Sequence, residues 1–247
     1  MRAFADSNVG LVREENQDVF RLCELQDGIL VAVLDGMGGV AGGKLAAELA
    51  ATEFISRFSV GCAELAKKGS APTDTDIHHL YSHAVYCANA KVLEAAVLNP
   101  ECKGMGTTLC AACLLGDTAY IAHIGDSRAY LVREGEAVPL TQDDSVVAER
   151  LARGEITKEE AENSAERHLL TRALGVALYA DFHFTVQKLK KGERLLLVTD
   201  GLYTHLTDEM IGAISAELPA RELPARLIGE ACSRGGRDNV TVAVAEL

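Results

Sequence analysis

Ile29-Leu30-Val31-Ala32-Val33-Leu34-Asp35-Gly36-Met37-Gly38-Gly39 is the stretch that decides how this chain folds. Its first six residues are apolar with no polar alternation, which predicts a strand buried on both faces. Asp35 then stands at the exit of that strand, where a loop can aim a carboxylate into a cleft. The glycines that follow allow a sharp turn and a close approach to a ligand. The alternative is an ordinary corner in which Asp35 caps the next helix.

The composition narrows the class of protein. A chain of 247 residues with 48% apolar content fits one large domain, or two small ones, with a sizeable core. The net charge of −12 comes without any basic block, which argues against nucleic acid or an anionic membrane as a partner. No run reaches the roughly 18 apolar residues of a membrane span, and Asp6 comes too early for a secretory signal. Seven scattered cysteines suit a reducing compartment, so we expect a cytoplasmic protein.

Strand and helix patterns follow one another along the rest of the chain. Tight turns at Gly116-Asp117 and Glu134-Gly135 predict hairpins, and hence antiparallel pairing. Residues 141–170 are polar and helical in pattern, and we expect them to form a small, mobile insertion near the site. The expected helices are 41–58, 76–98, 208–216 and 222–233, and the expected strands are 19–22, 29–34, 109–115, 119–124, 129–132, 182–186, 194–198 and 240–244.

Two other patterns suggest metal binding at first sight. His79 and His83 share one helix face at i, i+4 spacing, but no metalloprotease-type acid motif accompanies them. We interpret them as exposed helix histidines rather than as a zinc site. Cys110 and Cys113 form a C-x-x-C within a strand, where alternation points them to opposite faces, so we expect both to be core residues.

Several aspartates stand where an apolar strand starts or stops, beside a glycine or a turn. Carboxylates brought together repel one another unless a cation neutralises them. Oxygen ligands favour Mg²⁺ or Mn²⁺ over Zn²⁺, and two such ions about 3.5–4 Å apart are the usual arrangement for hydrolysing phosphate esters. Arg13, in a charged loop before the first of them, has the fork geometry to hold a phosphate. The aspartates are Asp18, Asp35, Asp126, Asp200 and Asp238.

Eight short motifs are spread along essentially the whole chain. They are Arg13-Glu14-Glu15-Asn16-Gln17-Asp18, Asp35-Gly36-Met37-Gly38-Gly39, Met105-Gly106-Thr107-Thr108, Ile124-Gly125-Asp126-Ser127-Arg128, Leu140-Thr141-Gln142-Asp143, Thr171-Arg172-Ala173-Leu174-Gly175, Val198-Thr199-Asp200-Gly201 and Asp238-Asn239-Val240-Thr241. In this order they resemble the PP2C (PPM) family of metal-dependent serine/threonine protein phosphatases, and its bacterial branch most of all. Any one of them is a weak signal, whereas eight in the family's order are very specific.

The resemblance implies an α+β fold, an α-β-β-α sandwich of two antiparallel sheets flanked by helix pairs. It implies one domain over residues 1–247, with 141–170 as a flap that influences substrate choice. Asp35 would bridge two core Mn²⁺ or Mg²⁺ ions, and the Gly36 carbonyl would bind one of them. Arg13 would grip the substrate phosphate, so that Arg13 and Asp35 are the catalytic residues. The remaining metal ligands would be Asp18, Asp200 and Asp238, with Asp126 on a third, weaker ion.

The implied reaction is metal-dependent hydrolysis of phosphoserine and phosphothreonine in proteins. A hydroxide bridging the two ions would attack phosphorus in line, without a phospho-enzyme intermediate. Cys23 and the other cysteines are disfavoured as nucleophiles because none sits in a phosphate-cradling glycine loop. The implied partners are phosphorylated proteins, as substrates of a serine/threonine kinase, and the kinase itself, with the chain acting as a monomer.

Three departures from the family pattern accompany the match. Met37 stands where eukaryotic members often place a histidine, so a metal-bound water is the expected acid. Val40 and Lys44 replace a usual histidine and glutamate, and Asp144 replaces a common histidine at the start of the flap. Two rival functions stay open: a pseudophosphatase that binds phosphoproteins or metal without turnover, and a hydrolase of a small phosphorylated metabolite.

Overall fold

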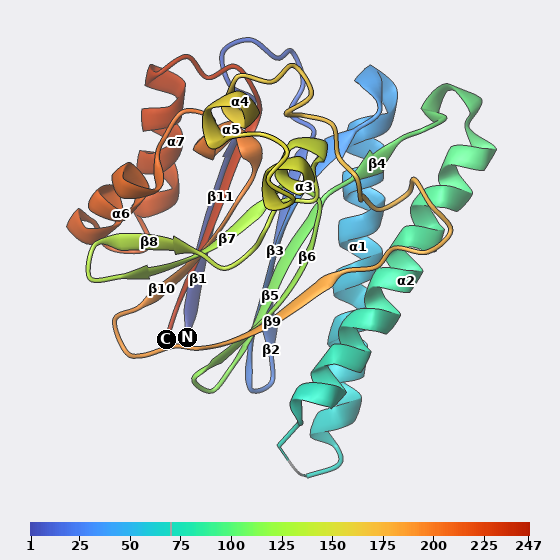
Figure 1. Ribbon diagram of the computed structural model, residues 1–247. Helices are drawn as coiled ribbons and strands as arrows, with labels where there is room; N and C mark the ends of the chain where they lie inside the picture. Colours follow the sequence, from blue (N-terminus) through green and yellow to red (C-terminus); the bar gives the residue numbers. More distant parts are fainter. Residues whose placement is uncertain (70) are drawn as a thin grey trace.

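Two antiparallel sheets pack face to face, with a pair of long helices on one outer face and a pair of shorter ones on the other (Figure 1). The computed structural model describes residues 1–69 and 71–247, apart from the side chains of Val40, Ala41 and Glu162. The departure at Val40 therefore concerns a side chain outside the described part. The predicted α-β-β-α sandwich is confirmed.

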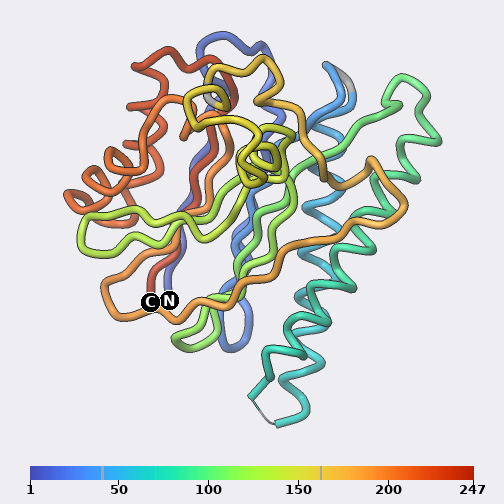
Figure 2. The backbone as a smooth tube through the Cα atoms, viewed as in Figure 1, coloured from blue at the N-terminus to red at the C-terminus, as the bar shows by residue number. Residues whose placement is uncertain are grey.

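The first sheet has five strands in the order β1-β11-β10-β7-β8. Helices α6 (Asp208–Glu217) and α7 (Leu223–Ser233) cover its outer face (Figure 1). The N-terminal strand pairs with the C-terminal one from Arg2↔Glu246 to Asn8↔Val240, so the two chain ends lie side by side (Figure 2). The strands are β1 (Arg2–Asn8), β7 (Arg128–Arg133), β8 (Glu136–Pro139), β10 (Arg194–Val198) and β11 (Val240–Glu246).

The second sheet runs β2-β3-β5-β6-β9, and the short β4 pairs with the end of β3. Helices α1 (Gly39–Ala66) and α2 (Asp74–Leu98) lie against it, and the 3-10 turn η1 (Pro100–Cys102) follows α2. The strands are β2 (Asp18–Leu25), β3 (Gly28–Met37), β4 (Gly106–Thr107), β5 (Leu109–Leu115), β6 (Thr118–Ile124) and β9 (His183–Lys188).

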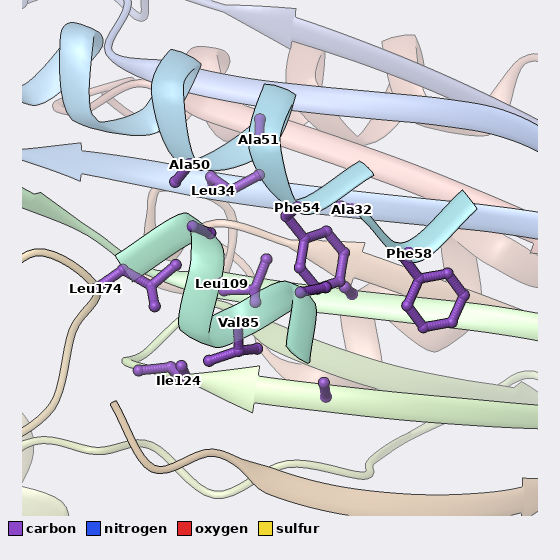
Figure 3. Packing of buried hydrophobic residues seen from close by; sticks show 14 of the residues in the cluster. Ala32, Leu34, Ala50, Ala51, Phe54, Phe58, Val85, Leu109, Ile124 and Leu174 are labelled. Carbon is purple, nitrogen blue, oxygen red and sulfur yellow. The ribbon is translucent and has the colours of Figure 1, made fainter. Parts of the chain in front are cut away.

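Apolar side chains fill three layers: one between the sheets and one under each helix pair. Figure 3 shows the layer under α1 and α2, where Phe54 of α1 lies beside Ala32 of β3, and Ala50 and Ala51 lie beside Leu34. Strand alternation divides the C-x-x-C pair as predicted. Cys110 lies between the sheets and Cys113 under the helices, so the interpretation of both as core residues is confirmed.

Residues 141–170 form the predicted small helical insertion, with α3 (Val146–Ala152) and α4 (Lys158–Glu162). The Ser145 hydroxyl accepts a hydrogen bond from the amide of Ala148 at the start of α3. Thr157 and Glu160 form a reciprocal capping box at the start of α4, which satisfies two amides that a helix end leaves free. We call this segment the flap. In Figure 1 it lies at the same end of the sandwich as the loop before β2 and the short helix α5 (Asp200–Tyr203).

The structure corrects the expected limits of several elements. Strand β3 continues to Met37, because Gly36 and Met37 pair with Thr107 and Gly106 of β4, so Asp35 lies inside the strand rather than at its exit. Helix α1 runs to Ala66 instead of ending near Gly61. A Cβ at Gly61 would stand 2.4 Å from the side chain of Leu80, so this glycine permits close packing against α2 instead of stopping the helix.

Five elements were not predicted: β1, β4, β8, α5 and the 3-10 turn η1. The N-terminal strand has half-buried rather than clearly alternating positions, which weakens its period-two signal. Within the described residues, no helix is long and apolar enough to cross a membrane.

Candidate active site

The backbone of Asp35 is held by the Met105–Thr108 motif. Its amide donates to the Thr108 hydroxyl at 2.8 Å, and its carbonyl accepts from the Thr108 amide at 2.9 Å and the Thr107 hydroxyl at 2.8 Å. These three bonds use the main chain of Asp35 and leave its carboxylate free. Asp35 also pairs in register with Asp18 on the neighbouring strand, so two acids lie opposite each other where β2 begins.

Asp18 is a buried carboxylate with only one of its oxygens bonded. Its Oδ2 accepts hydrogen bonds from the hydroxyls of Thr199 and Thr241, both at 2.7 Å. Its Oδ1 is buried and has no hydrogen-bond partner among the described residues. A buried carboxylate oxygen without a donor is costly unless a cation binds it. Asp18 therefore has the chemistry of a metal ligand whose orientation is fixed by two threonines.

We call the five aspartates Asp18, Asp35, Asp126, Asp200 and Asp238 the acidic group. Asp200 joins this group from the other sheet, and Asp126 joins it from the end of β6. Asp200 begins α5 and is buried, and its Oδ1 also lacks a hydrogen-bond partner among the described residues. Its Oδ2 lies 3.8 Å from Nδ1 of His168, which the flap contributes. Asp126 follows β6, and its carbonyl accepts a hydrogen bond from the hydroxyl of Tyr203 at 3.0 Å.

Arg13 reaches the acidic group from the loop before β2. Its Nη2 donates to Oδ2 of Asp238 at 2.8 Å, and its pKa is raised by Asp238 first and by Asp35 and Asp200 further away. Asn239 fixes this loop, because its side chain accepts from the amide of Gln17 and donates to the carbonyls of Val9 and Glu15. The guanidinium is more than half exposed, so it can also bind an incoming anion.

The five aspartates interact electrostatically with one another. Burial raises the pKa of Asp35 well above its usual range, and Asp18, Asp200, Asp126 and Asp238 raise it further, in that order. Burial likewise raises the pKa of Asp18 to about 7, against the two threonine hydrogen bonds that lower it. Burial and the charge of Asp200 raise the pKa of Asp126 to about 8. The group is therefore short of positive charge, which divalent cations would supply.

The five aspartates are near enough to affect one another's pKa, but their carboxylates are not tightly clustered. No three of them bring one carboxylate oxygen each within 4.8 Å of one another. Among the described residues, the one group of three or more potential ligands that meets this distance is His123, Asp144 and His183. The helix histidines His79 and His83 belong to no such group and are exposed, in keeping with their interpretation as surface residues.

The chain packs backbone against backbone beside Asp35. A Cβ at Gly36 would stand 2.1 Å from the carbonyl oxygen of Gly43, and a Cβ at Gly43 would stand 2.7 Å from the carbonyl oxygen of Gly36. Glycine at both positions lets the first turn of α1 approach the end of β3. Lys44, one of the departures, lies with its Nζ 3.7 Å from the Glu15 carboxylate.

Sequence reasoning missed the residues that orient the acids. Thr199 and Thr241 hold Asp18, Thr108 holds Asp35, and His168 approaches Asp200. Thr108 lies in the Met105–Thr108 motif, which contains no acid, whereas Thr199 and Thr241 lie inside motifs that were noted for their aspartates. A hydroxyl next to a buried acid in such a motif was the available signal, whereas nothing in the flap sequence marked His168.

The Protein phosphatase 2C family model matches residues 12–223, which is most of the chain and includes the flap and four of the five aspartates. The chain belongs to the protein phosphatase 2C family. The family assignment made from the eight motifs is therefore confirmed, and the individual ligand roles stay predictions.

Bacterial phosphatases of this family align with the whole chain. The serine/threonine protein phosphatase PstP of Mycobacterium tuberculosis is 35% identical over 247 residues, which is all of this chain and 45% of that protein. The chain thus spans less than half the length of that relative. The serine/threonine phosphatase of S. agalactiae superposes with a TM-score of 0.89 at 30% identity, over 98% of each chain. The PstP catalytic domain in complex with two manganese ions gives a TM-score of 0.84 at 34% identity, over 99% of this chain and 97% of that one.

Proposed function

We propose that this protein hydrolyses phosphoserine and phosphothreonine in proteins, with two Mn²⁺ or Mg²⁺ ions bound at the acidic group. The observation that carries the proposal is the pair of buried oxygens, Asp18 Oδ1 and Asp200 Oδ1, that have no donor among the described residues. They come from the two different sheets, and the charge of Asp200 acts on both Asp18 and Arg13. Membership of the phosphatase 2C family, and a family relative that holds two manganese ions, support the same assignment.

The ligand set proposed for the core ions is Asp35, the Gly36 carbonyl, Asp18, Asp200 and Asp238, with Asp126 on a third, weaker ion. All the side chains are carboxylates, which favours hard divalent cations over zinc. When bound, the ions supply a water of lowered pKa as the nucleophile and positive charge for the phosphoryl oxygens. Burial first, and then repulsion from the other four aspartates, raises the pKa of Asp35, and such ions would offset both effects.

The chain's own residues place the substrate and the acids. Arg13 would leave Asp238 in part and donate two hydrogen bonds to the phosphoryl oxygens, because its side chain is more than half exposed. Thr199 and Thr241 hold Asp18 in one orientation, and Thr107 and Thr108 hold the backbone of Asp35. This preorganisation keeps the carboxylates in place while charge develops on the phosphoryl group.

The proposed attack on phosphorus is direct and in line, with no covalent phospho-enzyme. Cys23 lies on β2 beyond Asp18, and its thiol contacts the hydroxyl of Ser59 at 3.3 Å, so it is engaged away from the acids. The proposed partners are phosphorylated proteins, including a serine/threonine kinase and its substrates, and the protein is proposed to act as a monomer in the cytoplasm.

The test is release of phosphate from a panel of phosphoserine and phosphothreonine peptides, with Mn²⁺, with Mg²⁺ and with EDTA. We expect turnover with either metal and none with EDTA. Sugar phosphates in the same assay separate a protein phosphatase from a metabolite hydrolase. Binding of a phosphopeptide without any turnover would instead identify a pseudophosphatase, and either of those results would contradict the proposal.

A further inference from the structure

A second cluster of potential ligands lies at the edge of the second sheet, apart from the five aspartates. His123 near the end of β6 and His183 at the start of β9 are cross-strand partners, so their side chains lie on the same face of the sheet. Their rings stack with centroids 5.9 Å apart. Asp144, at the start of the flap, joins them, and one ligand atom of each residue lies within 4.8 Å of the other two.

His123 is the unexplained member of this cluster. Its side chain is 1% exposed, and neither Nδ1 nor Nε2 has a hydrogen-bond partner among the described residues. The nearby backbone of Ser127 acts to raise the pKa of His123, yet it forms no hydrogen bond with either nitrogen of the ring. Burial lowers the pKa of His123, which keeps the imidazole neutral, and that is the form that binds metals. A buried imidazole with two free nitrogens needs a partner that these residues do not supply.

Asp144 is held firmly toward the two histidines. Its amide donates to the Gly125 carbonyl at 2.7 Å, and its Oδ2 accepts from the Gly125 amide at 3.0 Å. Its Oδ1 lies 2.9 Å from Nε2 of His183 and 3.0 Å from Nη1 of Arg172. The backbone amide thus orients the carboxylate, as outer hydrogen bonds do for metal ligands in general.

The contacts of Arg172 indicate that Asp144 and His183 lack a cation between them. Its Nη1 lies 2.8 Å from Nε2 of His183, and an arginine can only donate, so this nitrogen of His183 must present a lone pair to it. Oδ1 of Asp144 and Nε2 of His183 are then two acceptors 2.9 Å apart that share one arginine. If His183 were protonated instead, two donors would face each other. A cation placed among Asp144, His183 and His123 would satisfy all three side chains at once.

We propose that His123, Asp144 and His183 bind one zinc-class transition-metal ion, which displaces Arg172 from its place between Asp144 and His183. Two imidazoles and one carboxylate are a donor set that favours such an ion over Mg²⁺, in contrast to the all-oxygen acidic group. Ligands of a tetrahedral zinc ion lie about 3.3 Å apart, so only a small adjustment of the three side chains is needed. The ion would link the start of the flap to the end of β6 and the start of β9.

The test uses the whole chain with Mg²⁺ in excess, so that the acidic group is occupied by a hard cation. Co²⁺ is then titrated as a spectroscopic substitute for zinc, and its visible d–d absorption is followed. We expect one equivalent to bind with the intense band of a tetrahedral site, and Zn²⁺ to abolish that band by competition. The readout does not depend on phosphatase activity, so it stays informative even if the proposed function fails.

Substitutions test whether His123 and His183 produce the Co²⁺ absorption band. His123→Asn and His183→Gln should each weaken Co²⁺ binding about tenfold or more. His183 is about half exposed, so its variant carries the test if the buried His123→Asn does not fold, as judged by circular dichroism. The matched control is the double variant His79→Gln, His83→Gln, which removes two exposed helix histidines and should keep the band.

Arg172→Gln tests the displacement step. Removing the competing cation should tighten Co²⁺ binding several-fold, since the ion no longer has to replace an existing ion pair. The proposal is overturned if the wild-type protein shows no tetrahedral band, if His183→Gln leaves it unchanged, or if the His79, His83 control loses it. Weaker binding by Arg172→Gln would show that the arginine supports the ion rather than competing with it, and would overturn the displacement.

Discussion

Two buried carboxylates, Asp18 and Asp144, lie in this protein with opposite surroundings. Asp18 sits among like charges, with one oxygen held by two threonines and the other without a hydrogen-bond partner among the described residues. Asp144 has a backbone amide on one oxygen and Arg172 on the other, which it shares with the acceptor Nε2 of His183. The chain therefore supplies its own cation to Asp144 but leaves the region of Asp18 short of positive charge.

The difference is the one expected if the acids around Asp18 bind metal, as proposed. An ordinary buried acid is paired by the protein, because an unpaired charge in the interior is costly. A group of unpaired acids is tolerated where a ligand from solution binds to it. Without that ligand, the protein is expected to be less stable. Arg13 on Asp238 is a partial and exposed compensation at the edge of the acidic group.

The largest expected effect is the loss of activity in Asp35→Asn. This carboxylate is the proposed bridge between the core ions, so we expect hydrolysis of p-nitrophenyl phosphate with Mn²⁺ to fall by roughly 10³-fold or more. Steady-state rates at saturating metal measure it. Asp117→Asn, which changes an exposed hairpin acid paired with Lys188, is the matched control and should keep the wild-type rate. A near-normal rate in Asp35→Asn would refute the ligand assignment.

Arg13→Ala should chiefly raise KM for a phosphopeptide. A charge-assisted hydrogen bond contributes about 1.5–3 kcal/mol, which corresponds to roughly a 10- to 100-fold change. Initial rates over a range of peptide concentrations separate KM from kcat. Arg2→Ala is the matched control. Arg2 lies on β1 and is an exposed arginine paired with Glu246, so its removal should leave both constants unchanged. If KM stayed the same in Arg13→Ala, the arginine would not be the phosphate ligand.

The pH dependence of stability should distinguish the two carboxylate regions in the absence of metal. The pKa of Asp18 is raised from 3.8 to about 7 and that of Asp126 to about 8, so the folded state holds protons that the unfolded chain releases. With EDTA, stability should therefore fall as pH rises from about 4 to about 8, and Mn²⁺ should restore it. Thermal unfolding measures this as a Tm lower by several degrees at pH 8, since about 1 kcal/mol shifts Tm by about 2–4 °C at this size.

Asp144→Asn is the control for that experiment, because this carboxylate is already paired. The variant should be less stable at every pH, yet keep the same downward slope in EDTA. Asp18→Asn should flatten the slope. An equal slope in the Asp18 variant and in the wild type would show that the unpaired acids do not destabilise the metal-free protein.

The smallest expected effect belongs to Asp126→Ala. As the proposed ligand of a third, weaker ion, it should leave the core ions in place and reduce turnover a few-fold. The effect should be clear at limiting Mn²⁺ and fade at saturation, because binding of the weaker ion follows mass action. Rates across a metal titration test this, and identical curves for variant and wild type would remove Asp126 from the ligand set.

The sequence was sufficient for the family and the sandwich, while the ligand roles of the five aspartates stay predictions. Buried strands that deliver Asp35 and Asp200, and hairpin turns such as Glu134-Gly135, are local signals that survive folding. The end of β3 was misjudged because its last pairing partner, β4, lies some seventy residues away in the chain, and local pattern carries no trace of it. The length of α1 was misjudged because Gly61 serves packing against α2.

The orienting contacts could not be predicted for the same reason. The hydroxyls on Asp18 come from Thr199 and Thr241, which are far from it in the chain. Asp144 was noted only as a departure from the family pattern, although it is the centre of a network with His183 and Arg172. A residue's partners across a sheet are a property of the folded topology, which periodicity alone does not encode.

The central claim is that the unpaired acids are a site for two hard divalent cations. Anomalous diffraction from crystals of this protein grown with Mn²⁺ tests it most directly. We predict two manganese peaks about 3.5–4 Å apart among Asp18, Asp35, Asp200 and Asp238, with Asp18 Oδ1 and Asp200 Oδ1 turned toward them. Manganese peaks only at His123, Asp144 and His183, or none among the aspartates, would contradict the account.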